Sequence, residues 1–225
     1  MINSLEDHLK RTNNFLKMDT LEINSIREFN EWAKTYDGVL NRIYFSLSNR
    51  ILANLIHLQP NQSLLDVGCG TGIFLEIFAK KDSNLKLCGV DISSEMVSVA
   101  KNKFTDFPNI NITLGSVSKL PYGMNQFNYV VCANSFHHHP DSEKSISEMV
   151  RVLKPGGKLL ILDGFTDGNF RKKFWKRENK QHYEGKVFRY SKKEMLHLFK
   201  QVGLINIEQK ISMHINLITM GKKTN

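Results

Sequence analysis

Three glycines alternate with other residues directly after an apolar run, in the segment LLDVGCGTG at positions 64–72. Without Cβ atoms, Gly68, Gly70 and Gly72 allow the backbone to turn sharply and to lie against a ligand, and the start of the following helix presents free N–H groups. Asp91 ends the next apolar run, where a carboxylate can accept hydrogen bonds from both hydroxyls of a ribose. The spacing predicts a site for a ligand that contains a nucleoside.

The glycine spacing also discriminates between nucleoside ligands. A dinucleotide fingerprint needs G-x-G-x-x-G or a final Ala, but Ile73 stands three residues after Gly70. This argues against NAD and FAD and suits a ligand without a pyrophosphate. Asp66 stands where a carboxylate can help to hold a cationic amino-acid group. S-adenosylmethionine has both features.

The elements that must position these residues follow an α/β pattern. From Ser63 onward, short β-branched or Leu-rich runs alternate with amphipathic helical segments, which indicates βαβ units and a parallel sheet. The expected helices are 72–80, 93–104, 142–152 and about 191–202. The expected strands are 63–67, 86–91, 110–115, 127–132, 158–163, about 204–210 and about 212–220, the last two forming a hairpin.

The chain is expected to form a single structural unit. Residues 1–58 are rich in helix formers and predict two or three helices, as an N-terminal lid or substrate region before a main domain at 59–225. Within that domain, residues 164–190 are basic and aromatic without a clear period, and we interpret them as a mobile insertion. No Pro/Gly-rich linker divides the chain.

Several motifs together resemble the class I S-adenosylmethionine-dependent methyltransferases, especially the ubiquinone/menaquinone-biosynthesis type and related small-molecule enzymes (methyltransferase type 11). The matching segments are the glycine loop, GVDIS at 89–93, GSVSKLPY at 115–122, residues 127–141 and RVLKPGGKL at 151–159. FNEWAKTYD at 29–37 resembles the family's lead-in helix, and MGK at 220–222 resembles the tail of the quinone subgroup. The resemblance spans about residues 29–221. It implies a Rossmann-like, doubly wound, seven-stranded sheet in the order 3-2-1-4-5-7-6, with strand 7 antiparallel and N-terminal helices forming a lid.

The resemblance implies S-adenosylmethionine as cofactor and S-adenosylhomocysteine as product. The methionine end would contact Asp66 and the three glycines, the ribose would bind Asp91, and the adenine would lie between Ile92 and Val117. The cofactor-binding positions that the resemblance implies are Asp66, Gly68, Gly70, Gly72, Asp91, Ile92, Met96, Ser116, Val117 and Asn134. Ser116 departs from the family, whose members usually carry Asp there to accept from the adenine amino group. A hydroxyl accepts without charge assistance, so we expect weaker adenine recognition.

The acceptor side offers a candidate base in the segment NSFHHHPD at 134–141, directly after the fourth strand. His137 and His138 match a pair of histidines that many relatives carry there, and a neutral imidazole can accept a proton at physiological pH. His137 is the candidate base; alternatively, it only shapes the pocket. Tyr36 is the candidate lid residue near the methyl group, or a core aromatic. Adjacent histidines diverge in direction, so no metal site is predicted.

Bulk composition limits the class of protein. Among the 225 residues, 41% are apolar and 24% charged, as in globular domains. No apolar run approaches the roughly 20 residues that span a bilayer, and the N-terminus lacks the hydrophobic stretch of a secretory signal, so we expect a cytoplasmic protein. Three cysteines without a CxxC pair make disulfides and a zinc site unlikely.

The sequence leaves the methyl acceptor and the oligomeric state open. The favoured acceptor is a small molecule: a metabolite, a quinone precursor or a lipid headgroup. The net charge of +9 and the basic stretch at 170–177 keep nucleic acid and an anionic membrane surface open as partners. An RNA or protein methyltransferase and a non-catalytic cofactor-binding scaffold remain alternatives. The loop SFHHH at 135–139 departs from the SFGLRN of quinone enzymes, so a quinone substrate is not assigned.

Overall fold

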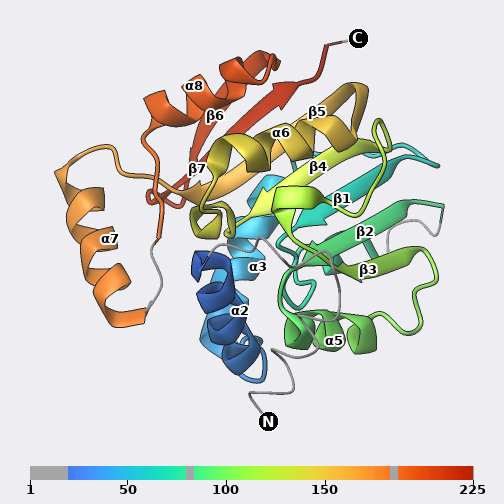
Figure 1. The fold of residues 1–225 in the computed structure, drawn as a ribbon, viewed down its shortest axis with the longest axis horizontal. Helices are drawn as coiled ribbons and strands as arrows, with labels where there is room; N and C mark the ends of the chain where they lie inside the picture. Colours follow the sequence, from blue (N-terminus) through green and yellow to red (C-terminus); the bar gives the residue numbers. More distant parts are fainter. Residues whose placement is uncertain (1–19, 80–83, 183–186, 225) are drawn as a thin grey trace.

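A seven-stranded sheet in the order β3-β2-β1-β4-β5-β7-β6 forms the centre of the computed structural model, which describes residues 20–79, 84–182 and 187–224 (Figure 1). β1 to β5 run parallel, and β7 is antiparallel to both β5 and β6. The strands are β1 Ser63–Val67, β2 Lys86–Asp91, β3 Ile110–Leu114, β4 Phe127–Ala133, β5 Leu153–Gly164, β6 Ile205–Ser212 and β7 Asn216–Lys222. The predicted strand order and the antiparallel last strand are confirmed.

Helices cover both faces of the sheet, and the sheet separates the core into two clusters. On one face, α4 (Glu76–Ala79) and α5 (Ser94–Lys103) pack with the end of α3 (Val39–Ala53). On the other face, α6 (Ser142–Val152) and α8 (Lys192–Gln201) bury their apolar sides. Every residue of β1 is buried, as expected for a central strand covered on both faces.

Helix α2 (Thr20–Trp32) runs across the carboxyl ends of the first three strands. Figure 1 shows α2 and α3 together at the carboxyl ends of the strands, between α5 and α7 (Asn169–His182). Side-chain hydrogen bonds tie α2 and the segment after it to the loops after β1, β2 and β3: Thr71 to Asp37, Ser93 to Asn30, and Ser116 to Glu22. Residues 1–19 of the expected N-terminal region lie outside the described residues.

The structure corrects two expected elements. The helix expected at 72–80 begins only at Glu76, because Gly72 has a φ of +84°, which is incompatible with a right-handed helix; Lys80 lies outside the described residues. The segment 164–190, interpreted as a mobile insertion without a clear period, contains the helix α7, and its residues 183–186 lie outside the described part.

The apolar period of α7 is weak because its contacts are not aliphatic. Arg171 and Trp175 are four residues apart on this helix, and both contact Phe165. The Arg171 guanidinium lies 4.2 Å from the centre of the Phe165 ring, and the Trp175 Nε1–H donates to the Phe165 carbonyl oxygen at 3.2 Å. A cation and an indole N–H thus fasten the helix to the end of β5. In the described part of the chain, no helix has the length and apolar content to cross a membrane.

Candidate active site at the carboxyl ends of the strands

Backbone hydrogen bonds hold the glycine loop after β1 against β2. The N–H groups of Gly68 and Cys69 both donate to the Val90 carbonyl oxygen, at 2.8 and 3.1 Å. Gly68 has a φ of +71°, a conformation that favours glycine. A Cβ at this position would overlap the Ser135 hydroxyl. The chain can therefore turn at Gly68 only because that residue lacks a side chain.

Asp91, at the end of β2, is buried and braces the glycine loop. Its Oδ2 accepts from the Gly70 N–H at 2.8 Å, and its Oδ1 accepts from the Ser93 N–H at 2.9 Å. Burial raises the pKa of the Asp91 carboxyl, although the hydrogen bonds from Ser93 and Gly70 oppose the shift. A carboxylate has about four acceptor positions, so Asp91 retains capacity for hydroxyl donors from a ligand.

Asp66, on β1, lies buried beneath the glycine loop in a small pocket that Gly68 and Asn134 also line. Among the described residues, its Oδ1 has no hydrogen-bond partner. Burial, and secondarily the negative charge of Asp91, raises the pKa of Asp66 to about 8. A buried acceptor without a partner costs about 1–3 kcal/mol. A cationic donor from a ligand would relieve that cost and favour the ionised form.

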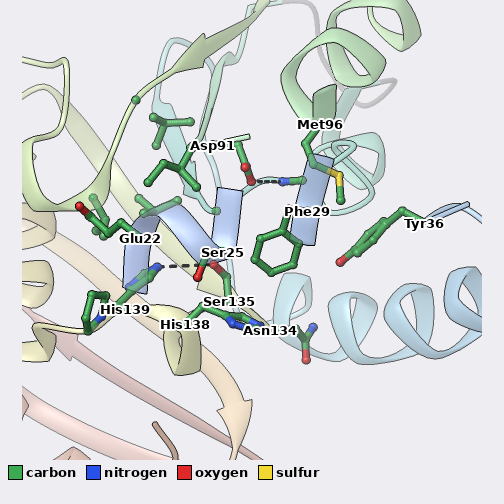
Figure 2. Close-up of a pocket in the computed structure, with 18 residues that line it drawn as sticks. Glu22, Ser25, Phe29, Tyr36, Asp91, Met96, Asn134, Ser135, His138 and His139 are labelled. Carbon is green, nitrogen blue, oxygen red and sulfur yellow. Dashed lines mark hydrogen bonds between the residues drawn. The ribbon is translucent and has the colours of Figure 1, made fainter. Parts of the chain in front are cut away.

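Two neighbouring cavities lie at the carboxyl ends of the strands, and they share four lining residues. The first, about 720 Å³ including its mouth, is lined by the glycine loop, Asp91 and residues of α2. The second, about 1530 Å³ by the same measure, lies between α2, α3 and α7. The residues that line both are Phe29, Tyr36, Asn134 and His138, which Figure 2 shows close to one another. Molecules bound in the two cavities would both lie beside these four side chains.

Apolar and polar residues line different parts of the first cavity. Ile92, Met96 and Val117 provide apolar walls. Ser116 does not line the cavity directly, because its hydroxyl donates to Glu22 Oε1 at 2.7 Å and accepts from the Ser118 N–H at 3.1 Å. The side chain at the position where relatives carry Asp is therefore engaged by a carboxylate from α2.

The second cavity combines aromatic and polar side chains. Seven aromatic side chains line it: Phe29, Trp32, Tyr36, Tyr44, Phe45, Phe174 and Trp175. Its polar groups include a buried cluster in which Asp163, near the end of β5, contacts His137 Nδ1 at 2.8 Å and Arg189 Nη1 at 3.4 Å. The Arg189 guanidinium in turn lies 3.7 Å from the centre of the Trp175 ring.

The cluster holds His137 in its neutral form. Burial lowers the pKa of the His137 imidazole, and the Asp163 carboxylate only partly opposes this effect. The pKa of Asp163 is itself lowered: burial would raise it, but His137 and Arg189 outweigh that effect. A neutral imidazole that donates from Nδ1 to an ionised carboxylate leaves Nε2 as the nitrogen that can accept a proton.

His138 and His139 follow in the short 3-10 helix η2 (Phe136–His138) and its cap. The His138 ring packs edge-on against Phe29, with ring centres 4.8 Å apart, and burial holds its pKa well below the usual value. Burial also lowers the pKa of His139 to about 4. Across residues 20–79, 84–182 and 187–224, no group of three or more His, Cys, Asp or Glu side chains is arranged to hold a metal ion.

The segment 29–37 places an aromatic ring, that of Tyr36, beside the glycine loop. Asp37 accepts from the Thr71 hydroxyl and pairs with Lys103 Nζ at 2.8 Å. This anchor sets Tyr36 beside Gly70, where an added Cβ would lie 3.8 Å from the tyrosine ring. Tyr36 also stacks on Phe45, with ring centres 5.3 Å apart. The 3.8 Å distance is an ordinary van der Waals contact, so glycine at position 70 is favoured by its φ of +52° and not by the tyrosine ring.

The structure gathers most of the predicted residues around the first cavity, whose lining includes Tyr36, Gly68, Gly70, Asp91, Ile92, Met96, Val117 and Asn134. Three predicted cofactor positions lie elsewhere. Asp66 is in the pocket beneath the loop, Ser116 is behind Glu22, and Gly72 faces Phe104, which an added Cβ would overlap. The candidate base, His137, lines the second cavity.

The sequence analysis did not identify three residues of the site: Glu22, Asp163 and Arg189. Asp163 had a usable signal, because it is an acidic residue near the carboxyl end of a predicted strand, as Asp91 is. Glu22 had no comparable signal. An acidic residue in the first turn of a helix is ordinarily explained by its favourable interaction with the helix dipole.

Sequence comparison finds similarity to methyltransferases. Residues 65–161 match the family model described as a methyltransferase domain. The chain is 34% identical over 145 residues to the ubiquinone/menaquinone biosynthesis C-methyltransferase of Geotalea daltonii, covering 61% of this chain and 62% of that protein. The chain is therefore similar to methyltransferases over its central part. Two solved structures that resemble this chain hold S-adenosylhomocysteine and S-adenosylmethionine.

Other similar proteins extend the match beyond the family model. The chain is 28% identical over 207 residues to a demethylmenaquinone methyltransferase of Staphylococcus aureus, covering 80% of this chain and 85% of that protein. The chain spans about three-fifths of the length of the more identical curated relatives.

Solved structures share the methyltransferase fold. A methyltransferase in a Haloferax volcanii complex with the activator Trm112 has a TM-score of 0.76 at 22% identity, covering 89% of this chain and 97% of that one. A Haemonchus contortus phosphoethanolamine N-methyltransferase, solved with phosphomonomethylethanolamine and S-adenosylhomocysteine, has a TM-score of 0.68 at 16% identity, covering 92% of this chain and 61% of that one. At these identities the similarity concerns the fold alone.

Proposed function

We propose that this chain uses S-adenosylmethionine to methylate a small molecule bound in the second cavity. The observation that carries the proposal is that two neighbouring cavities share the lining residues Phe29, Tyr36, Asn134 and His138. One cavity carries the glycine loop and strand-end acid suited to a nucleoside, and the other is large and combines aromatic and polar side chains. Transfer between two bound molecules needs their reacting atoms adjacent and held in line.

The residues at the ends of β1, β2 and β3 fit this cofactor. Asp66 Oδ1 is a buried acceptor suited to an ammonium group, and Asp91 retains capacity for ribose hydroxyls. When bound, the cofactor supplies an activated methyl group that an acceptor attacks directly. The chain then has to orient the acceptor, exclude water and accept a proton. We propose that α2 and α3 act as the cover that excludes water.

His137 is the proposed proton acceptor, with Asp163 as its positioning residue. Burial keeps the imidazole neutral, and the 2.8 Å contact to Asp163 orients the ring. A base of this kind suits an acceptor whose oxygen, nitrogen or carbon loses a proton on methylation. His138, which lines both cavities, is the alternative acceptor.

The lining of the second cavity supports an acceptor with an apolar, ring-containing body. Aromatic walls bind planar rings by stacking and edge contacts, and the buried cluster around Asp163 offers one polar end. The relatives named for quinone biosynthesis act on molecules of that kind. Because the loop after β4 differs from that of the quinone enzymes, we propose this class of acceptor and no particular quinone.

Isotope transfer tests the proposal. The protein is incubated with methyl-labelled S-adenosylmethionine and an extract separated into small-molecule, lipid, RNA and protein fractions. Label is expected in the small-molecule or lipid fraction. Label confined to RNA or protein would refute the proposed acceptor class. Tight cofactor binding without label in any fraction would instead indicate a binding scaffold.

The raised pKa of Asp66 predicts that cofactor binding depends on pH. With a pKa of about 8, Asp66 is mostly protonated at pH 7, and an ammonium group at Oδ1 would lower that pKa. Binding therefore releases a proton, so affinity for S-adenosylhomocysteine should rise from pH 6 to pH 8, by up to about tenfold per unit, and then level off.

Calorimetry in buffers of different ionisation enthalpy measures that proton release directly. Asp66→Asn should bind more weakly and lose most of the pH dependence, while any slope due to Asp91 remains. Equal pH slopes in the wild type and in Asp66→Asn would contradict the assignment.

A further inference from the structure

Helix α2 brings a carboxylate to the part of the first cavity that lies beyond β3. Glu22 is only 7% exposed, and its Oε1 accepts from the hydroxyls of Ser116 and Ser118, at 2.7 and 2.8 Å. Figure 2 shows Glu22 at one end of the group of residues around this cavity and Tyr36 at the other end. Among the described residues that line the cavity, Glu22 and Asp91 are the acidic ones.

The order of the strands determines which part of a nucleoside would face Glu22. β1, β2 and β3 are successive neighbours in the sheet, so the loops after them lie side by side. If the amino-acid end of the cofactor lies at the glycine loop after β1, and the ribose at Asp91 after β2, the base extends over the end of β3. Glu22 is hydrogen-bonded to Ser116 at that end.

Adenine carries an exocyclic amino group whose N–H donors need acceptors when buried. Ser116 is poorly suited to this task, because its hydroxyl hydrogen is already donated to Glu22 and its oxygen accepts from the Ser118 N–H. The Glu22 carboxylate has about four acceptor positions, of which the two serine hydroxyls use two. An ionised acceptor also gives a stronger hydrogen bond than a hydroxyl.

We propose that Glu22 recognises the exocyclic amino group of the adenine. The inference rests on the proposed function, and it assigns the base-selecting carboxylate to the covering helix instead of the sheet. The same carboxylate then bonds the loop after β3 and the ligand. Cofactor binding should therefore also stabilise the docking of α2 on the strand ends.

A ligand pair that differs only in the amino group tests this role. The probes are S-adenosylhomocysteine and its analogue with purine in place of adenine, which lacks the 6-amino group. Wild-type protein should bind the adenine ligand at least about tenfold more tightly, as expected for a hydrogen bond to a charged group. In Glu22→Ala this ratio should fall to nearly one, and Glu22→Gln should give an intermediate ratio because its amide oxygen is uncharged.

Two further variants serve as controls. Glu31→Gln alters an exposed acidic residue on the same helix and should leave both affinities unchanged. Ser118→Ala removes one hydrogen bond that docks α2 but keeps the carboxylate, so it should preserve the ratio even if both affinities fall.

The ratio separates ligand recognition from helix docking. If Glu22→Ala weakens both ligands equally and keeps the wild-type ratio, Glu22 only docks the helix and the inference is wrong. If the wild type binds S-adenosylhomocysteine tightly without preferring it over the analogue, the inference fails while the proposed function stands. If the wild type binds neither ligand, both fail together.

Discussion

Asp91→Ala is expected to weaken the binding of S-adenosylhomocysteine by at least about 100-fold. The substitution removes the proposed acceptor of two ribose hydroxyls, and hydrogen bonds to a charged group contribute about 1.5–3 kcal/mol each. It also removes the acceptor for the Gly70 and Ser93 N–H groups, which loosens the glycine loop. Titration calorimetry measures the affinity directly.

Asp106→Ala is the matched control for that experiment. Asp106 is an exposed acidic residue shortly after α5, and its loss should leave cofactor affinity unchanged. Thermal unfolding of the unliganded Asp91→Ala protein reveals any loss of fold, and Asp91→Asn, which keeps the shape of the side chain, provides a second variant. Wild-type affinity in a folded Asp91→Ala protein would refute the ribose assignment.

His137→Ala should lower turnover by about 100- to 10,000-fold while leaving cofactor affinity close to normal, because general-base catalysis contributes a factor of that size. The residue lines the second cavity and not the first, so its loss should not disturb the cofactor. Single-turnover transfer to the acceptor fraction identified by labelling separates the chemical step from binding. His197→Ala, an exposed histidine on α8, is the matched control.

The pH profile tests the same role independently. Burial lowers the pKa of His137, so wild-type turnover should fall only below the ordinary histidine pKa of about 6.5, as the imidazole gains a proton. The Asp163 carboxylate raises the pKa of His137, so Asp163→Asn should shift that acidic limb to lower pH as well as reduce the rate. Normal turnover in His137→Ala, with a large loss in His138→Ala, would transfer the role to His138.

The sheet and its glycine loop were predictable because their signals are local. Each parallel strand is a short apolar run buried on both faces, and the amphipathic segments between them can only be crossover helices. The loop was equally predictable, since the glycine at position 68 indicates its positive φ and the spacing along the chain places Asp91 at a strand end. The helix α7 was left open because its contacts use Arg171 and Trp175 instead of an apolar stripe.

Pairings across the fold were not predictable from residue spacing. Glu22 and Ser116 are 94 positions apart and meet only because α2 crosses the ends of β1, β2 and β3. His137 and Asp163 are 26 positions apart and meet because β4 and β5 are neighbours in the sheet. The role of Ser116 as a weak adenine acceptor stays a prediction, and the structure adds a carboxylate, that of Glu22, hydrogen-bonded to its hydroxyl.

The sequence by itself determined the alternation of strands and helices and the turn at the glycine loop, because these depend on backbone sterics and hydrophobic period within short segments. The strand order was implied by the family resemblance. The tertiary structure decided where the second cavity lies, which histidine has a carboxylate partner and which helix crosses the end of β3. Those features depend on contacts between distant segments. The free energy of such contacts comes from packing, which short sequence patterns do not predict.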